Sequence, residues 1–167
     1  VVDSARRPAR YLDDFLGALK RQAHLRLIEQ WVGTPTGGRI LKTDLFEEAM
    51  GADAFLRDLT TKGASVIGMD IAPAIVGRAK DRGQMEGAHS VVADVRRLPF
   101  AAGAFELIIS PSTLDHFVDA GDLGRSLREL RRTLQRTGQL IVTLDNRQNV
   151  CDPLLRCLSW LKLTPYW

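Results

Sequence analysis

The chain has 167 residues, of which 45% are hydrophobic and 26% charged, and its formal net charge is +3. This length and apolar content suit a single globular domain over residues 1–167 and exclude a disordered composition. Its two cysteines, Cys151 and Cys157, form no C-x-x-C pair, which argues against a disulfide framework and against a zinc site. No run approaches the roughly 20 apolar residues that cross a bilayer, so we expect a cytoplasmic protein with no membrane partner.

The first part of the chain predicts a helix. From Tyr11 to Val32, apolar residues recur at helical spacing, and Leu19, Ile28 and Trp31 belong to this stripe. Glycines and a proline stop the pattern directly afterwards. We therefore interpret residues 1–37 as an N-terminal helical lead-in.

Residues 38–146 alternate between strand and helix patterns and form the expected core. The expected strands are 39–43, 65–70, 90–94, 105–110 and 139–144, and the expected helices are 54–62, 73–82 and 123–134, with a Thr137-Gly138 turn before the last strand. Such alternation predicts an α/β fold with a doubly wound, mostly parallel sheet and helices on both faces. The apolar segment 147–167 is interpreted either as a helix packed on the core or as a lid over a substrate.

Polar residues stand at the ends of the expected strands. They are Asp44, Asp70, Asp94, Ser110 and Asp145. In an open parallel sheet, ligands bind at the carboxyl ends of the strands, where the strand order reverses. Neighbouring carboxylates repel one another and must be solvated or hydrogen-bonded, so this pattern favours a ligand rich in hydroxyl and amino groups.

Two stretches resemble the class I methyltransferase family, which binds S-adenosylmethionine on a Rossmann-like fold. The first is Val-Ile-Gly-Met-Asp-Ile-Ala-Pro over residues 66–73, and the second runs from residue 91, through the Leu-Pro-Phe turn at 98–100, to the Leu-Asp-His-Phe at 114–117. The resemblance covers residues 39–146, and order and spacing agree as well as residue type. The family adds a terminal strand pair after the fifth strand, and none is visible in this sequence.

The resemblance assigns roles to individual residues. It implies that Asp70 holds both ribose hydroxyls, since one carboxylate has two acceptor oxygens, and that Asp94 accepts from the adenine amino group. It places Ser110 beneath the methionine moiety. The neighbouring positions Thr43, Asp44, Gly51, Ile71 and Val95 complete the expected cofactor site. Asp44 and Asp70 are also suited to capping the helices that follow them.

The sequence departs from the family at the first strand. There the family has an acidic residue followed by a glycine-rich loop, whereas residues 41–51 read Leu-Lys-Thr-Asp-Leu-Phe-Glu-Glu-Ala-Met-Gly. Either Asp44 replaces the usual acid and the loop still curls around the methionine end, or Glu47 and Glu48 obstruct the site. Because S-adenosylmethionine carries a sulfonium and an ammonium group, extra carboxylates favour it over a pyrophosphate-containing dinucleotide.

Three functions fit these observations. The first is an S-adenosylmethionine-dependent methyltransferase acting on a small molecule, since no strongly basic groove exists to hold a nucleic acid. The second is a catalytically silent module that binds S-adenosylmethionine or serves as a partner subunit. The third, a dinucleotide oxidoreductase, is disfavoured because no G-x-G-x-x-G follows the first strand. A homo-oligomer is compatible with each of them.

His116 is the candidate catalytic residue. It is the histidine nearest the expected mouth of the site, and an imidazole there would take a proton from a substrate nucleophile, or would only pack the loop. Methyl transfer relies mainly on in-line positioning, so the lack of a catalytic triad is consistent with a methyltransferase. No residue pattern indicates a metal ion.

Overall fold

The computed structural model describes residues 14–33, 38–51, 53–60 and 63–144. In chain order the elements are α1 (Asp14–Val32), β1 (Arg39–Lys42), α2 (Phe46–Met50), α3 (Leu56–Thr60), β2 (Ser65–Asp70), α4 (Pro73–Asp81), β3 (Ala88–Val92), β4 (Phe105–Pro111), the short 3₁₀ helix η2 (Leu114–His116), α5 (Ala120–Thr133) and β5 (Leu134–Thr143). The lid suggested for 147–167, the strand-end residue Asp145 and any terminal strand pair fall outside the described residues.

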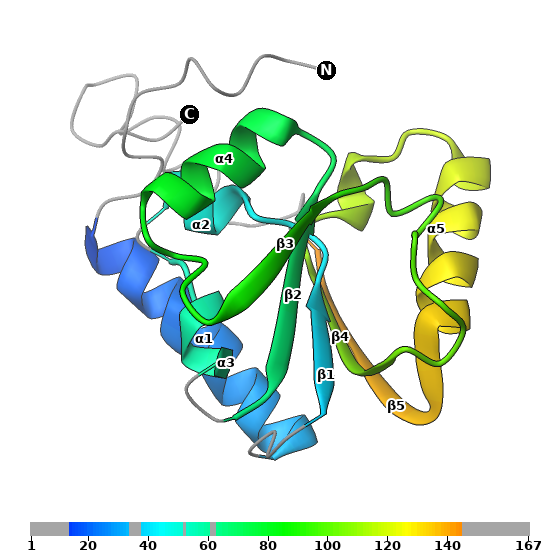
Figure 1. Cartoon of the computed structure of the whole chain (residues 1–167), viewed down its shortest axis with the longest axis horizontal. Coiled ribbons are helices and arrows are strands. Elements are labelled where there is room, and N and C mark those ends of the chain that lie inside the picture. Colours follow the sequence, from blue (N-terminus) through cyan, green and yellow to red (C-terminus); the bar gives the residue numbers. More distant parts are fainter. Residues whose placement is uncertain (1–13, 34–37, 52, 61–62, 145–167) are drawn as a thin grey trace, which may run out of the picture.

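The strands form one parallel sheet in the order β3-β2-β1-β4-β5 (Figure 1). The central strand is β1, where Leu41 lies opposite Ile67 of β2 and Ile108 of β4. The chain moves outward from β1 to β3 and then crosses to β4 on the other side, so the strand order reverses between β1 and β4. The carboxyl ends of these strands therefore share the edge at which such sheets bind ligands.

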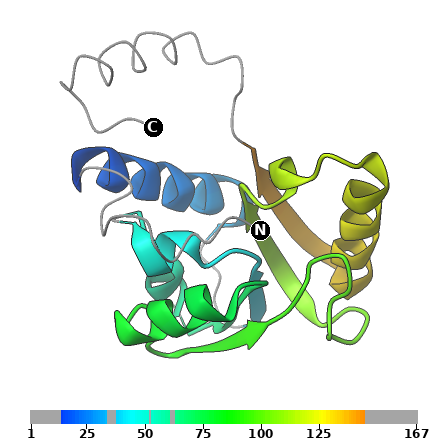
Figure 2. The ribbon, with the colours of Figure 1, turned by 90° about the horizontal axis from the view of Figure 1, so that it is seen from above.

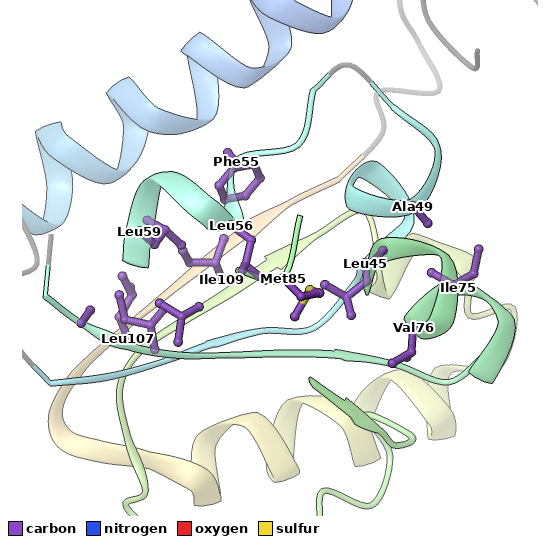
Figure 3. Packing of buried hydrophobic residues seen from close by; sticks show 14 of the residues in the cluster. Leu45, Ala49, Phe55, Leu56, Leu59, Ile75, Val76, Met85, Leu107 and Ile109 are labelled. Atoms are coloured by element: carbon purple, nitrogen blue, oxygen red, sulfur yellow. The ribbon is translucent and has the colours of Figure 1, made fainter. Parts of the chain in front are cut away.

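Helices cover both faces of the sheet, which confirms the doubly wound α/β fold (Figure 2). Side chains of α1 to α4 pack on one face, and Figure 3 shows part of this core, with Phe55 and Leu56 near Ile109 of β4. On the other face, Leu130 of α5 packs with Phe105 and other residues of the second core cluster. Burial of two apolar layers is the main force that holds the sheet between its helices.

Several element boundaries differ from the sequence prediction. β2 has the predicted bounds, but β3 ends two residues before Asp94, and α3 is shorter than the helix expected over 54–62. α5 begins earlier than the expected residue 123, because the Asp119 side chain caps it by accepting a hydrogen bond from the Gly121 amide at 2.9 Å.

The turn predicted at Thr137-Gly138 is wrong, because β5 runs through both residues. A register shift against β4 absorbs the extra length of β5. At Gly138 the two strands approach closely, since an added Cβ would lie 2.9 Å from the Glu106 carbonyl oxygen. Glycine marks close backbone approach here rather than a turn.

The apolar stripe predicted for α1 is wrong at two positions. Leu19 is 54% exposed and Trp31 is 67% exposed, whereas the buried positions His24 and Ile28 lie one helical turn apart. The His24 ring packs on the ring of Phe55, with 5.0 Å between centroids. The buried face of α1 includes the polar His24. The spacing of the apolar residues therefore predicted a buried face that is rotated from the observed one.

Candidate functional site

A pocket of about 650 Å³ lies at the carboxyl edge of the sheet. Its lining comes from α1 (Lys20), the segment after β1 (Thr43, Asp44, Phe46, Glu47), the end of β2 and start of α4 (Met69, Asp70, Ile71, Ala72, Ile75), the loop after β3 (Ala93, Asp94, Val95, Arg96) and the segment after β4 (Pro111, Ser112, Thr113, His116, Phe117). The pocket thus spans the position where the strand order reverses.

Asp70 is held rigidly at the end of β2. One carboxylate oxygen, Oδ1, accepts a hydrogen bond from the Ala72 amide at 2.8 Å, and Oδ2 accepts one from the Leu45 amide at 3.2 Å. Burial raises the pKa of Asp70, and these two backbone bonds act against that rise. The Ala72 amide precedes α4, so Asp70 fixes the turn before this helix and does not cap the helix itself, in contrast to the capping role that its position suggested. Each oxygen has a second acceptor site, and Asp70 remains able to accept hydrogen bonds from a ligand. Ile71 beside it is 56% exposed and offers an apolar surface.

Asp94 lies in the loop after β3 and is paired with Arg96. The Arg96 Nη2 donates to Asp94 Oδ2 at 2.6 Å, and its Nη1 donates to Asp122 of α5 at 3.0 Å. The hydrogen bonds from Arg96 hold the pKa of Asp94 below its ordinary value. The loop after β3 is therefore tied to the start of α5, with an ionised carboxylate on the pocket wall.

A group of hydroxyls joins the ends of β1 and β4. The Thr43 Oγ1 donates to the buried Ser110 Oγ at 2.9 Å and lies 2.9 Å from Thr113 Oγ1. Ser112, next in the segment, has a left-handed backbone with φ of 45°, and its amide donates to the Thr143 carbonyl at 2.8 Å. Non-glycine residues are strained in this region, and such strain is concentrated at functional sites.

Lys42 ends β1 and is completely buried. Its Nζ donates to Glu47 Oε2 and Glu48 Oε2, each at 2.7 Å, and to the Asp44 carbonyl oxygen. Burial lowers the pKa of Lys42, but the two carboxylates outweigh it and leave this pKa above its ordinary value. We call Lys42, Glu47 and Glu48 the Lys42 cluster, and it replaces the expected glycine-rich loop with side chains.

Asp44 follows Thr43 on the pocket wall. It is half-buried, and its Oδ1 accepts a hydrogen bond from the amide of Phe46, the first residue of α2, at 2.6 Å. Burial raises the pKa of Asp44 to about 7, with Lys42 opposing this rise and Glu47 adding to it. Asp44 thus satisfies the helix start and also faces the pocket.

The predicted site residues are mostly brought together. The pocket lining includes Thr43, Asp44, Asp70, Ile71, Asp94, Val95 and His116. Gly51 does not line it, and neither does Ser110, which lies behind Thr43. His116 is exposed in η2 at the rim. Their roles toward a ligand stay predictions.

Two charged pocket residues were missed by the sequence prediction. Arg96 stands two positions after Asp94, and this spacing was the available signal for an ion pair. Lys20 comes from α1, more than 20 residues before β1 ends, and no local pattern connects it to the site. In the described part of the chain, no helix has both the length and the apolar character needed to cross a membrane.

The fold and this pocket define a Rossmann-like α/β domain of the class that binds nucleoside cofactors at the switch point. The chain belongs to the methyltransferase domain family, whose model matches residues 46–142, more than half of its length. This is the class I, Rossmann-like group of methyltransferases, as the two motifs indicate.

Individual proteins are similar to this chain in sequence or in fold. The chain is 35% identical over 81 residues to a malonyl-[acyl-carrier protein] O-methyltransferase of Legionella pneumophila, covering 48% of this chain and 28% of that protein. A Pyrococcus horikoshii protein has a TM-score of 0.69 at 21% identity, over 91% of this chain and 64% of that one. The N-methyltransferase NodS of Bradyrhizobium japonicum, solved with S-adenosylhomocysteine, has a TM-score of 0.60 at 18% identity, over 73% and 60%.

The chain is shorter than these relatives. It spans 28% of the length of the Legionella enzyme and 64% of the Pyrococcus protein. At these levels of identity the two solved structures establish the fold, and the reaction and its substrate are matters for proposal.

Proposed function

We propose that this chain binds S-adenosylmethionine in the pocket at the carboxyl edge of the sheet and transfers its methyl group to a small-molecule substrate. The observation that carries the proposal is Asp70, a carboxylate fixed by two backbone amides at the end of β2 and facing the pocket. Vicinal hydroxyls of a ribose supply two donors for its remaining acceptor sites.

The residues around Asp70 fit the rest of this cofactor. Ile71 offers an apolar surface for a purine ring, and Asp94 on the same side offers an acceptor for an exocyclic amine. The carboxylates of Asp44 and Glu47 lie after β1, on the other side of Asp70. Negative groups there suit a ligand whose reacting end is cationic, and would repel a pyrophosphate.

The chain's own contribution to the reaction is mainly orientation. The cofactor supplies an activated methyl group, and a substrate nucleophile in line with it displaces a neutral thioether. Thr43 and Thr113 offer hydroxyls for positioning, and the exposed His116 stands at the rim, where it would accept a proton released by the nucleophile.

The substrate class is open to a defined screen. The Legionella relative is named for a malonyl group on an acyl carrier protein, so carboxylic acids, free and carrier-bound, are the first compounds to test. A cytoplasmic location, independence from nucleic acids and a homo-oligomeric state stay predictions.

The test is calorimetric titration of the folded chain with S-adenosylmethionine and S-adenosylhomocysteine, with NAD as a control. We expect both S-adenosyl ligands to bind. Asp70→Asn should lower the affinity for each of them by at least about tenfold, or 1.4 kcal/mol, because one hydrogen-bond acceptor in a desolvated contact becomes a donor. Asp81→Asn, an exposed carboxylate at the end of α4, is the matched control and should bind as the wild type does.

Two outcomes would contradict the proposal in different ways. A folded wild-type chain that binds neither ligand would overturn it and leave the silent partner module. Unchanged affinity in a folded Asp70→Asn variant would place the ribose elsewhere, even if the cofactor binds.

A further inference from the structure

The Lys42 cluster stands where the family has an acid and a glycine-rich loop, so the methionine end of the cofactor must be recognised differently in this chain. The last residue of β1 is a lysine, and its ammonium is enclosed by Glu47 and Glu48. A buried cation at this position cannot accept hydrogen bonds from a ligand's ammonium group. The partner for that group therefore lies outside β1, where the carboxylates of Asp44 and Glu47 line the pocket wall.

The two carboxylates of the cluster have different surroundings. Glu48 is directed into the core, where its Oε1 accepts hydrogen bonds from the amides of Phe55 at 3.3 Å and Leu56 at 3.1 Å. Glu47 lines the pocket, and its Oε1 lies 3.6 Å from the Lys20 ammonium. Only the second of these carboxylates is therefore in a position to meet a ligand.

Lys20 brings a cation to the same wall. Its side chain is 35% exposed and lines the pocket, and it is held by Asp53 at 3.1 Å as well as by Glu47. An anion and a cation thus stand side by side where α1 meets α2. A free α-amino acid group carries the complementary pair, an ammonium and a carboxylate.

The order of the strands indicates how the cofactor lies along the carboxyl edge of the sheet. In that order, Asp94 follows β3, Asp70 ends β2 and Asp44 follows β1. Glu47 of α2 lines the same pocket three residues after Asp44 and is its electrostatic neighbour, and Lys20 is paired with Glu47. We infer that Glu47 and Lys20 bind the α-ammonium and the α-carboxylate of the cofactor's methionine end, in place of the missing acid and glycine-rich loop. This inference rests on the proposed function.

The test uses two neutral-sulfur ligands that differ in the amino-acid group. S-Adenosylhomocysteine carries it, and 5′-methylthioadenosine has the same nucleoside without it. We expect Glu47→Gln to lower the affinity for S-adenosylhomocysteine at least tenfold and to leave the affinity for methylthioadenosine within twofold of the wild type. Glu48→Gln removes a carboxylate from the same lysine, but Glu48 does not line the pocket, so any loosening of the wall should affect both ligands alike and leave the ratio of the two affinities within twofold of the wild type.

A second pair of variants tests the cation. Lys20→Met should lower the affinity for S-adenosylhomocysteine and leave that for methylthioadenosine unchanged. Arg21→Met, at the next residue of α1, is the control: it breaks an ion pair with Asp58 outside the pocket and should leave both affinities unchanged. Lys20 is also the ion-pair partner of the buried Asp53, and the loss of this pair is expected to lower stability without favouring one ligand over the other.

The outcomes separate this inference from the proposed function. If the wild type binds neither nucleoside ligand, the proposed function fails. If it binds both, and Glu47→Gln and Lys20→Met retain S-adenosylhomocysteine affinity or lose both ligands equally, the inference is overturned and the cofactor site stands.

Discussion

Lys42 shows how one residue can replace a sequence motif. Removing a charged side chain from water is costly, and the cost is offset only when good partners surround it. Lys42 has two carboxylates at 2.7 Å, and Glu48 gains two further backbone donors. Burial raises the pKa of Glu48 despite its lysine partner. Burial acts in the same direction on Glu47, but Lys42 and Lys20 outweigh it and hold the pKa of Glu47 below its ordinary value. Of the two carboxylates of the cluster, Glu47, which lines the pocket, is thus the more firmly ionised.

Removing the lysine alone should destabilise the fold strongly. We expect Lys42→Met to lower the free energy of unfolding by about 3–5 kcal/mol, because two buried carboxylates lose their cation. Chemical denaturation at pH 7 measures this change. The triple variant Lys42→Met, Glu47→Gln, Glu48→Gln should recover a large part of the loss, since no buried charge is left unpaired. A single variant as stable as the wild type would show that the cluster is solvated.

The sequence predicted elements well where one local pattern governs them. β2 ends on Asp70 as expected, because a short apolar run followed by a carboxylate and a proline gives both limits. The prediction failed where tertiary contacts decide. His24 is buried on α1 because Phe55 covers it, and Lys20 joins the pocket across a long sequence separation. The strand-end carboxylates were therefore predictable, whereas partners that lie far away in the sequence, such as Lys20, were not.

The close approach of β4 and β5 at Gly138 predicts how a substitution there changes stability. An added Cβ at Gly138 would lie 2.9 Å from the Glu106 carbonyl oxygen and 2.8 Å from Leu134, so Gly138→Ala should destabilise the chain by about 1–3 kcal/mol. Gly77 in α4 has no neighbour within 4 Å of such a Cβ, and Gly77→Ala should stabilise by roughly 0.5–1 kcal/mol. Thermal unfolding compares the two variants; a neutral Gly138→Ala would mean that the strands separate easily.

At the scale of the whole molecule, local and net charge have opposite signs. The chain carries a net charge of +3, yet its pocket is lined by the carboxylates of Asp44, Glu47, Asp70 and Asp94. Lys20 and Arg96 are the cations among the lining residues, and each is already paired with one of these acids. The pocket therefore favours cationic ligands although the surface as a whole does not.

The negative charge of the pocket predicts that the affinity for S-adenosylmethionine depends on pH. Burial raises the pKa of Asp44 to about 7, so below that pH the group is mostly protonated, and above it the group is ionised and attracts a sulfonium. The affinity for S-adenosylmethionine relative to neutral-sulfur S-adenosylhomocysteine should therefore rise between about pH 6 and 8. Titrations across this range measure the ratio, and Asp44→Asn should flatten it. A ratio independent of pH in the wild type would place the sulfur away from Asp44.

The Lys42 cluster also affects the entropy of binding. A glycine-rich loop has wide backbone freedom, and a ligand that orders it must overcome that loss each time it binds. In this chain the segment after β1 is already fixed by a buried lysine, two carboxylates and the carbonyl of Asp44. The ordering takes place once, when the protein folds, and the pocket meets each ligand with its wall already in place.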